Sequence, residues 1–94
     1  MRVYLAGAMS GIHRLNRPRF DREAAILRSE GHEVFNPHEA CPEDTPYREA
    51  MAIDLDWICR HADAVALLPG WSGSKGATAE REVAIALGLQ IMYL

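Results

Sequence analysis

The stretch Asp63-Ala64-Val65-Ala66-Leu67-Leu68 is a nearly unbroken apolar run. It lacks the alternation of apolar and polar residues that is typical of a strand with one face in water. A continuous run of this length favours a strand covered on both faces, as in a parallel sheet between two layers of helices. We therefore predict a buried strand over residues 63–68 and an α/β fold around it.

The rest of the chain alternates between strand-like and helix-like segments. The pattern predicts further strands over residues 2–6, 32–35 and 90–94 and helices over 16–30, 47–61 and 76–87. Asn16 is the expected cap of the first helix, with Pro18 in its first turn. Such alternation favours a parallel sheet with right-handed crossovers. We predict one domain over residues 1–94, a flavodoxin-like or Rossmann-like three-layer sandwich whose four-stranded parallel sheet has the order 2-1-3-4.

The composition is that of a small globular protein. Of the 94 residues, 49% are apolar and 24% are charged, and the net charge is −3. This charge gives no reason to expect a nucleic-acid polymer as partner, and no apolar run reaches the length of a membrane span. The histidines and cysteines lack metal-ligand spacing, so we expect no metal and no cofactor. We expect a cytoplasmic homodimer or larger assembly, with Trp57 and Trp71 as candidate interface anchors.

Three loops follow the predicted strands, at the edge where parallel sheets bind ligands. They span residues 7–14, 36–46 and 69–75. The last leads into Gly73-Ser74-Lys75-Gly76 at a helix start, where free N–H groups and the helix dipole suit a phosphate. Ser74 either offers its hydroxyl to such an anion or is simply the helix cap, and the sequence leaves both alternatives open.

Glu80 shares a helical face with apolar residues. It lies three and four residues before Val83 and Ala84, which with Leu87 form the expected apolar stripe of the last helix. A carboxylate aimed along a core face rarely lacks a partner. The alternative is an acid that is favoured only by the nearby helix N-terminus.

Asp54 holds a matching position in the preceding helix. Met51, Leu55 and Ile58 define the apolar stripe there, and Asp54 shares their face. The alternative role is an interhelical salt bridge. Burial raises the pKa of a carboxyl group, whereas a helix N-terminus or a tyrosine hydroxyl lowers it. One balance of these effects leaves Glu80 ionised and Asp54 protonated near neutral pH.

Tyr4 stands near the end of the first predicted strand. Its hydroxyl can reach the mouth of the expected pocket, although a core tyrosine before a turn is the more common arrangement. The glycines that follow Tyr4 allow a ligand to approach the backbone closely, but their spacing matches no standard nucleotide-binding motif.

Two segments resemble the nucleoside 2-deoxyribosyltransferase superfamily. They are Tyr4-Leu5-Ala6-Gly7-Ala8-Met9-Ser10-Gly11 and Gly76-Ala77-Thr78-Ala79-Glu80, the latter followed by Ala84-Ile85-Ala86-Leu87-Gly88. The run from Asp63 to Trp71 is most similar to a phage and bacterial branch of that superfamily, domain of unknown function 4406 (DUF4406). The chain departs from many relatives at Arg81 and Glu82, where isoleucine and glycine are usual. It also lacks the helix that often follows the last strand.

The resemblance implies a role for each matched residue. The glutamate at the position of Glu80 attacks the anomeric carbon of a deoxyribose, Tyr4 holds that carboxylate, and Asp54 is a candidate proton donor. Ser74 and Gly76 match residues that hold the phosphate of a deoxynucleoside 5′-monophosphate. Further candidates for substrate contact lie in the three loops: Gly7, Met9, Ser10, Gly11, Asn36, Gly70 and Trp71. In characterised relatives a neighbouring subunit completes the site.

We therefore expect an enzyme that cleaves or transfers the N-glycosidic bond of a (deoxy)nucleoside or its 5′-monophosphate. Capture of the sugar by Glu80 gives a covalent glycosyl-enzyme, which water or a second base then resolves. Two alternatives remain open. The first is a module that binds or sequesters a nucleotide without turnover, and the second is a structural or interaction protein whose motif residues only preserve the fold.

Overall fold

The computed structural model of the protein describes residues 1–94. Its four strands are β1 (Arg2–Ala6), β2 (Glu33–Phe35), β3 (Ala64–Leu67) and β4 (Gln90–Tyr93). Its helices are α1 (Arg17–Ser29), α2 (Pro37–Ala40), α3 (Tyr47–His61) and α4 (Lys75–Ala86), with two 3-10 turns, η1 (His13–Asn16) and η2 (Trp71–Gly73). None of these helices combines the length and the apolar character that crossing a membrane requires.

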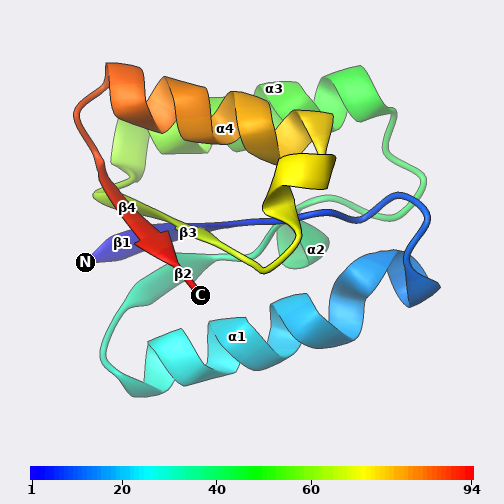
Figure 1. Cartoon of the computed structure of the whole chain (residues 1–94), viewed down its shortest axis with the longest axis horizontal. Coiled ribbons are helices and arrows are strands. Elements are labelled where there is room, and N and C mark those ends of the chain that lie inside the picture. Colours follow the sequence, from blue (N-terminus) through cyan, green and yellow to red (C-terminus); the bar gives the residue numbers. More distant parts are fainter.

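All strands of the sheet are parallel, in the order β2-β1-β3-β4. This confirms the predicted order 2-1-3-4. The central strand β3, which lies within the apolar run that indicated the fold, is buried along its whole length. Figure 1 shows α1 on one side of the sheet and α3 with α4 on the other. The protein therefore has the predicted Rossmann-like three-layer α/β fold.

Alternate residues of β1 and β3 serve two separate apolar cores, because successive side chains of a strand point to opposite faces. The α1-side core consists of Val3, Leu5, Ala64, Ala66 and Leu68 with Val34 and the α1 residues Phe20, Ala24 and Leu27. The opposite core consists of Tyr4, Ala6, Val65 and Leu67 from the sheet with Ile58 from α3, Ala62 directly after α3, and Ala77 and Ala84 from α4. The sheet thus presents a different set of side chains to each helical layer.

The segment 36–46 differs from the sequence prediction, which made it a loop. It contains the short helix α2, because the side chain of Asn36 accepts a hydrogen bond from the backbone N–H of His38 at 3.1 Å. Pro37 occupies the first helical position, where its missing N–H costs nothing.

Asn16 was expected to cap α1 and does not. Its own backbone is left-handed, as are those of Arg14 and Leu15 before it. Its side-chain amide instead donates to the carbonyl of Ala8 at 3.0 Å. Asn16 therefore ties the loop after β1 to the start of α1 rather than satisfying the helix N-terminus.

Candidate active site

A pocket of about 430 Å³ opens at the carboxyl end of β1, between α3 and α4. Its walls are the loop after β1, the first turns of α3 and the N-terminal half of α4. Its volume lies in the range of small-molecule sites, and its position is where ligands bind in open parallel sheets. The pocket therefore forms where the sequence predicted a ligand site.

Tyr4, Asp54 and Glu80 come from three different elements and all line this pocket. They are almost fully buried, at 1%, 6% and 4% exposure respectively. The hydroxyl of Tyr4 donates to Oε2 of Glu80 at 2.6 Å, a short hydrogen bond across 76 residues of sequence. The structure thus brings together the three residues that the sequence singled out for catalysis.

Small side chains of α4 place Glu80 at this depth. The buried stripe of the helix runs through Ala77, Glu80 and Ala84. Leu87, which the sequence assigned to the stripe, is 49% exposed because the helix ends at Ala86 and the chain turns toward β4. Alanines on both sides of Glu80 let α4 lie close to the sheet, and this closeness brings the carboxyl group to the Tyr4 hydroxyl.

In α3, Asp54 is buried together with only one apolar residue of the expected stripe. Asp54 and Ile58 are the buried residues of this helix, whereas Met51 and Leu55 are half-buried. Met51 and Asp54 both line the pocket. The N-terminal half of α3 therefore faces the pocket, and its C-terminal half packs on the sheet.

Burial controls the protonation of both carboxyl groups. It raises the pKa of Glu80 to about 8, and the charge of Asp54 adds to this while the Tyr4 hydroxyl opposes it. Burial also raises the pKa of Asp54 to about 6, against the hydrogen bonds of Tyr4 and Cys41. Burial, together with the two carboxylates, raises the pKa of Tyr4 well above its usual value, so the hydroxyl keeps its proton.

Between pH 6 and 8, the carboxyl pair therefore holds one proton and one negative charge, with the proton on Glu80. This is the reverse of the balance considered from the sequence. Glu80 lies beyond the first turn of α4. The helix dipole fades over that distance, so loss of hydration dominates its pKa.

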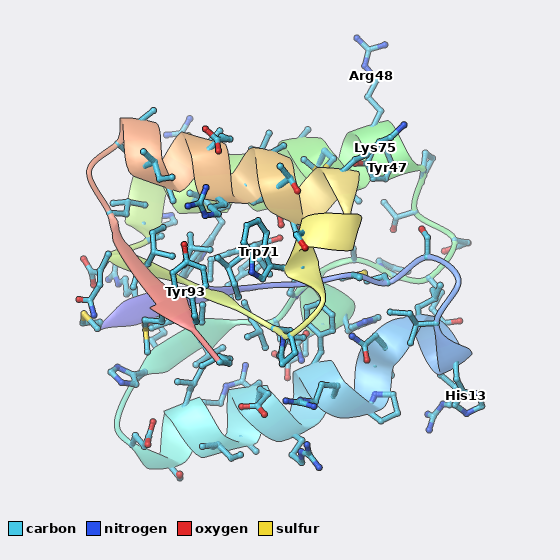
Figure 2. The ribbon with its side chains drawn as sticks, in the orientation of Figure 1. His13, Tyr47, Arg48, Trp71, Lys75 and Tyr93 are labelled. Carbon is cyan, nitrogen blue, oxygen red and sulfur yellow. The ribbon has the colours of Figure 1, made fainter.

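At the start of α4, Ser74 is the helix cap. Its Oγ accepts a hydrogen bond from the N–H of Ala77 at 3.1 Å, and the residue also lines the pocket. A Cβ on Gly76 would lie 3.2 Å from Oη of Tyr47 and 3.5 Å from Sδ of Met51. Glycine at this position therefore lets α3 and α4 approach closely beside the pocket. Figure 2 shows Tyr47 and Lys75 at this end of the two helices, where both line the pocket.

Not all predicted substrate contacts lie in the pocket. Of the loop candidates, Gly7, Met9 and Ser10 line it together with Ser74 and Gly76. Gly11 and Gly70 are exposed turn residues with positive φ, and they do not line it.

Two further candidates, Asn36 and Trp71, are also outside the pocket lining. Asn36 is buried. Its side-chain oxygen accepts a hydrogen bond from the N–H of His38, and its side-chain amide donates one to the carboxylate of Asp21. Trp71 packs near the ring of Tyr93, with the guanidinium carbon of Arg81 5.1 Å from its ring centre. Both side chains are therefore engaged in structural contacts.

Sequence reasoning missed the α3 wall of the pocket. Tyr47, Ala50 and Met51 line it with Pro37 and Lys75. Tyr47, Ala50 and Met51 precede Asp54 at spacings of seven, four and three residues. These spacings put all four on one helical face, so the signal was present in the sequence.

Metal-binding groups are not assembled here, since no three His, Cys, Asp or Glu side chains lie close enough together to hold an ion.

One family model matches the chain, over residues 1–93, and is described as "Domain of unknown function (DUF4406)". No curated protein and no solved structure matches the chain.

Proposed function

The chain belongs to the DUF4406 family, and from this premise we propose that it cleaves or transfers the N-glycosidic bond of a (deoxy)nucleoside or its 5′-monophosphate. The observation that carries the proposal is the buried pair Glu80 and Asp54 at a pocket of suitable size, with the Tyr4 hydroxyl donating to Glu80. The resemblance of the segments around Tyr4 and Glu80 to nucleoside 2-deoxyribosyltransferases supports the same reaction.

A pair of carboxyl groups that carries one proton and one charge suits glycosidic chemistry. The reaction passes through an oxocarbenium-like state, which needs one carboxylate beside the anomeric carbon and one acid beside the leaving group. Around neutral pH the pair carries one charge and one proton. Environments that push two pKa values apart are a general route to such a division of roles.

In the proposed reaction, Glu80 attacks the anomeric carbon while the bond to the base nitrogen breaks. The electron pair of that bond leaves with the base, which takes a proton from Asp54. Water or a second base then attacks the anomeric carbon and releases the Glu80 carboxylate, and Asp54 accepts the proton of the attacking group. The pair ends with the single proton with which it began.

This order of reaction steps requires the proton to move from Glu80 to Asp54 before Glu80 attacks. The proton resides on Glu80, whose pKa of about 8 exceeds that of Asp54, about 6. Moving it costs on the order of a few kcal/mol. Positive charge that develops at the anomeric carbon favours the ionised form of Glu80, and the Tyr4 hydroxyl stabilises that form by its hydrogen bond.

The start of α4 is the proposed phosphate subsite. Backbone N–H groups at a helix N-terminus attract anions, and Ser74, Lys75 and Gly76 all line the pocket. In crystals soaked with a nucleoside monophosphate, we expect the phosphate within hydrogen-bond reach of these amides. A phosphate bound elsewhere, with this end of the pocket empty, would show that the subsite is wrongly placed.

The activity test is a panel of nucleosides and 5′-monophosphates in which released base is measured by chromatography. We expect base release by the wild type and a loss of about 1000-fold or more in Glu80→Gln. Asp54→Asn should lose about 100-fold or more, as expected for a missing general acid. Glu82→Gln and Asp56→Asn are matched controls on the same helices, since both residues are exposed.

Three results would change this proposal. Full activity in Glu80→Gln would remove its nucleophile. If the adduct of a trapped intermediate maps to Asp54, the two acids exchange roles. If wild type and Glu80→Gln bind a nucleotide equally and neither releases base, the protein is a nucleotide-binding module. The raised pKa of Glu80 favours this alternative, because a protonated carboxyl group is a poor nucleophile.

A further inference from the structure

Cys41 lies behind one of the two acids. It directly follows α2, and its Sγ is 3.8 Å from Oδ1 of Asp54. Cys41 is half-buried and does not line the pocket, whereas Asp54 does. The thiol therefore contacts the carboxyl group from outside the space that a ligand would fill.

The thiol is suited to donate a hydrogen bond rather than to react. Burial raises the pKa of Cys41, and the charges of Asp54 and Glu49 raise it further, so sulfur keeps its proton near neutral pH. A protonated thiol is a weak nucleophile but can donate a weak hydrogen bond. Its bond lowers the pKa of Asp54 against the effect of burial.

We propose that Cys41 is a positioning residue whose thiol holds the Asp54 carboxyl group toward Tyr4 and the pocket. The groups that face Asp54 are Tyr4 from β1, Glu80 from α4 and Cys41 from the segment after α2. Only the thiol stands outside the pocket lining. It can therefore keep its contact with Asp54 when a ligand is bound.

The weakness of the thiol as a donor fits this role. Asp54 must release and take up a proton in each proposed catalytic cycle, and a strong donor would oppose its protonation. A thiol orients the carboxyl group with little resistance to that change. The catalytic consequence rests on the proposed function, whereas the contact and its effect on Asp54 do not.

The test is a carboxyl-carbon NMR titration of Asp54 in the protein. In Cys41→Ala and Cys41→Val, we expect the pKa of Asp54 to rise by about half a pH unit, since a hydrogen bond to the charged form is lost. Valine is larger than cysteine and leaves no cavity, so an effect seen in both variants does not come from a cavity. Cys59→Ala is the matched control, because Cys59 is the other free cysteine and is exposed on the same helix as Asp54.

A pKa of Asp54 that moves no more in the Cys41 variants than in Cys59→Ala would overturn the proposal. With an active protein, the limb of the pH–rate profile that reports Asp54 should shift by the same amount, with KM unchanged. If the wild type releases no base, the proposed function fails, while the titration still decides whether Cys41 acts on Asp54.

Discussion

The two helical layers of the sandwich cover the same sheet with different kinds of buried side chain. Where α1 meets the sheet, the core cluster is apolar and includes the fully buried Phe20, and the buried polar residues beside this helix are Asn36 and His38. Where α3 and α4 meet it, two carboxyl groups and a tyrosine hydroxyl lie at comparable depth. Both layers are served by β1, since Val3 and Leu5 face α1 and Tyr4 faces the other way. One short strand thus contributes to stability on one face and to the candidate site on the other.

The difference shows where this fold gains and loses free energy. Buried apolar surface contributes about 25 cal/mol per Å², so the α1 layer stabilises the protein in proportion to its contacts. A buried carboxyl group instead loses hydration, and its charged form is disfavoured. We expect loss of a buried apolar side chain in the α1 layer and loss of the buried charge of Glu80 to change stability in opposite directions.

The largest expected effect lies in the α1 layer. Phe20 is fully buried, and its ring packs edge-on against His38 at 4.9 Å between centroids. Phe20→Ala should lower the free energy of unfolding by about 3–5 kcal/mol, the usual range for a core aromatic residue. Urea denaturation measures this, with the half-exposed Ile26 of the same helix as control, where Ile26→Ala should change little. A loss below about 1 kcal/mol in Phe20→Ala would show that burial of this ring contributes little to stability.

The opposite sign is expected for Glu80→Gln. The pKa of Glu80 rises from 4.5 to about 8 on folding, so the unfolded chain releases this proton first. Below pH 4.5 both states are protonated and the charge costs nothing. Between pH 4.5 and 8 the folded state progressively loses stability, and above pH 8 the loss is complete.

Glu80→Gln removes this loss and should raise the free energy of unfolding by on the order of 2–4 kcal/mol at pH 9 but by little at pH 4. Urea denaturation at both pH values is the measurement, and the exposed Glu82→Gln is the control. Destabilisation of Glu80→Gln at pH 9 would show that the charged glutamate stabilises the folded state, contrary to the expected cost of its burial.

A glycine from each region gives a smaller contrast. A Cβ on Gly7 would lie 2.9 Å from Cβ and Cδ1 of Leu68 in the α1-side core, whereas one on Gly76 would lie 3.2 Å from the Tyr47 hydroxyl. Gly7→Ala should cost about 1–3 kcal/mol, because a packed core yields poorly. Gly76→Ala should cost less, because the tip of the exposed Tyr47 can move. Equal losses in thermal unfolding would contradict this contrast.

The smallest expected effect concerns the helix cap. Ser74→Ala removes the acceptor for the N–H of Ala77 and should cost about 1 kcal/mol of stability. Ser74→Asn offers another capping oxygen and should restore most of that loss in the same denaturation assay. If Ser74→Ala is as stable as wild type, the serine is retained for the pocket and not for the helix.

The sequence predicted the parts of this molecule that depend on local patterns. The apolar run at 63–68 and the helical spacing of Glu80 and Asp54 are such patterns, and they led to the sheet order and to the buried acids. The predicted cap of α1 was wrong because the Asn16 side chain donates a hydrogen bond to the carbonyl of Ala8 instead. Only the folded loop creates this contact.

The same limit applies within the site. The order of the two pKa values depends on how deeply each carboxyl group is buried, which a helical face alone does not reveal. Cys41 carried no signal, because it reaches Asp54 only when the segment after α2 folds back against α3. Long-range packing decides such contacts, and sequence spacing does not encode them.

The α3–α4 layer holds a carboxyl pair, Glu80 and Asp54, that carries one proton at neutral pH. The most direct test follows the side-chain carboxyl carbons of Glu80 and Asp54 by NMR from pH 3 to 10, with Glu80→Gln and Asp54→Asn to assign the signals. We expect two separated steps, with apparent pKa values of about 6 and about 8, the higher dominated by Glu80. Two ordinary titrations, both complete below pH 5, would contradict it.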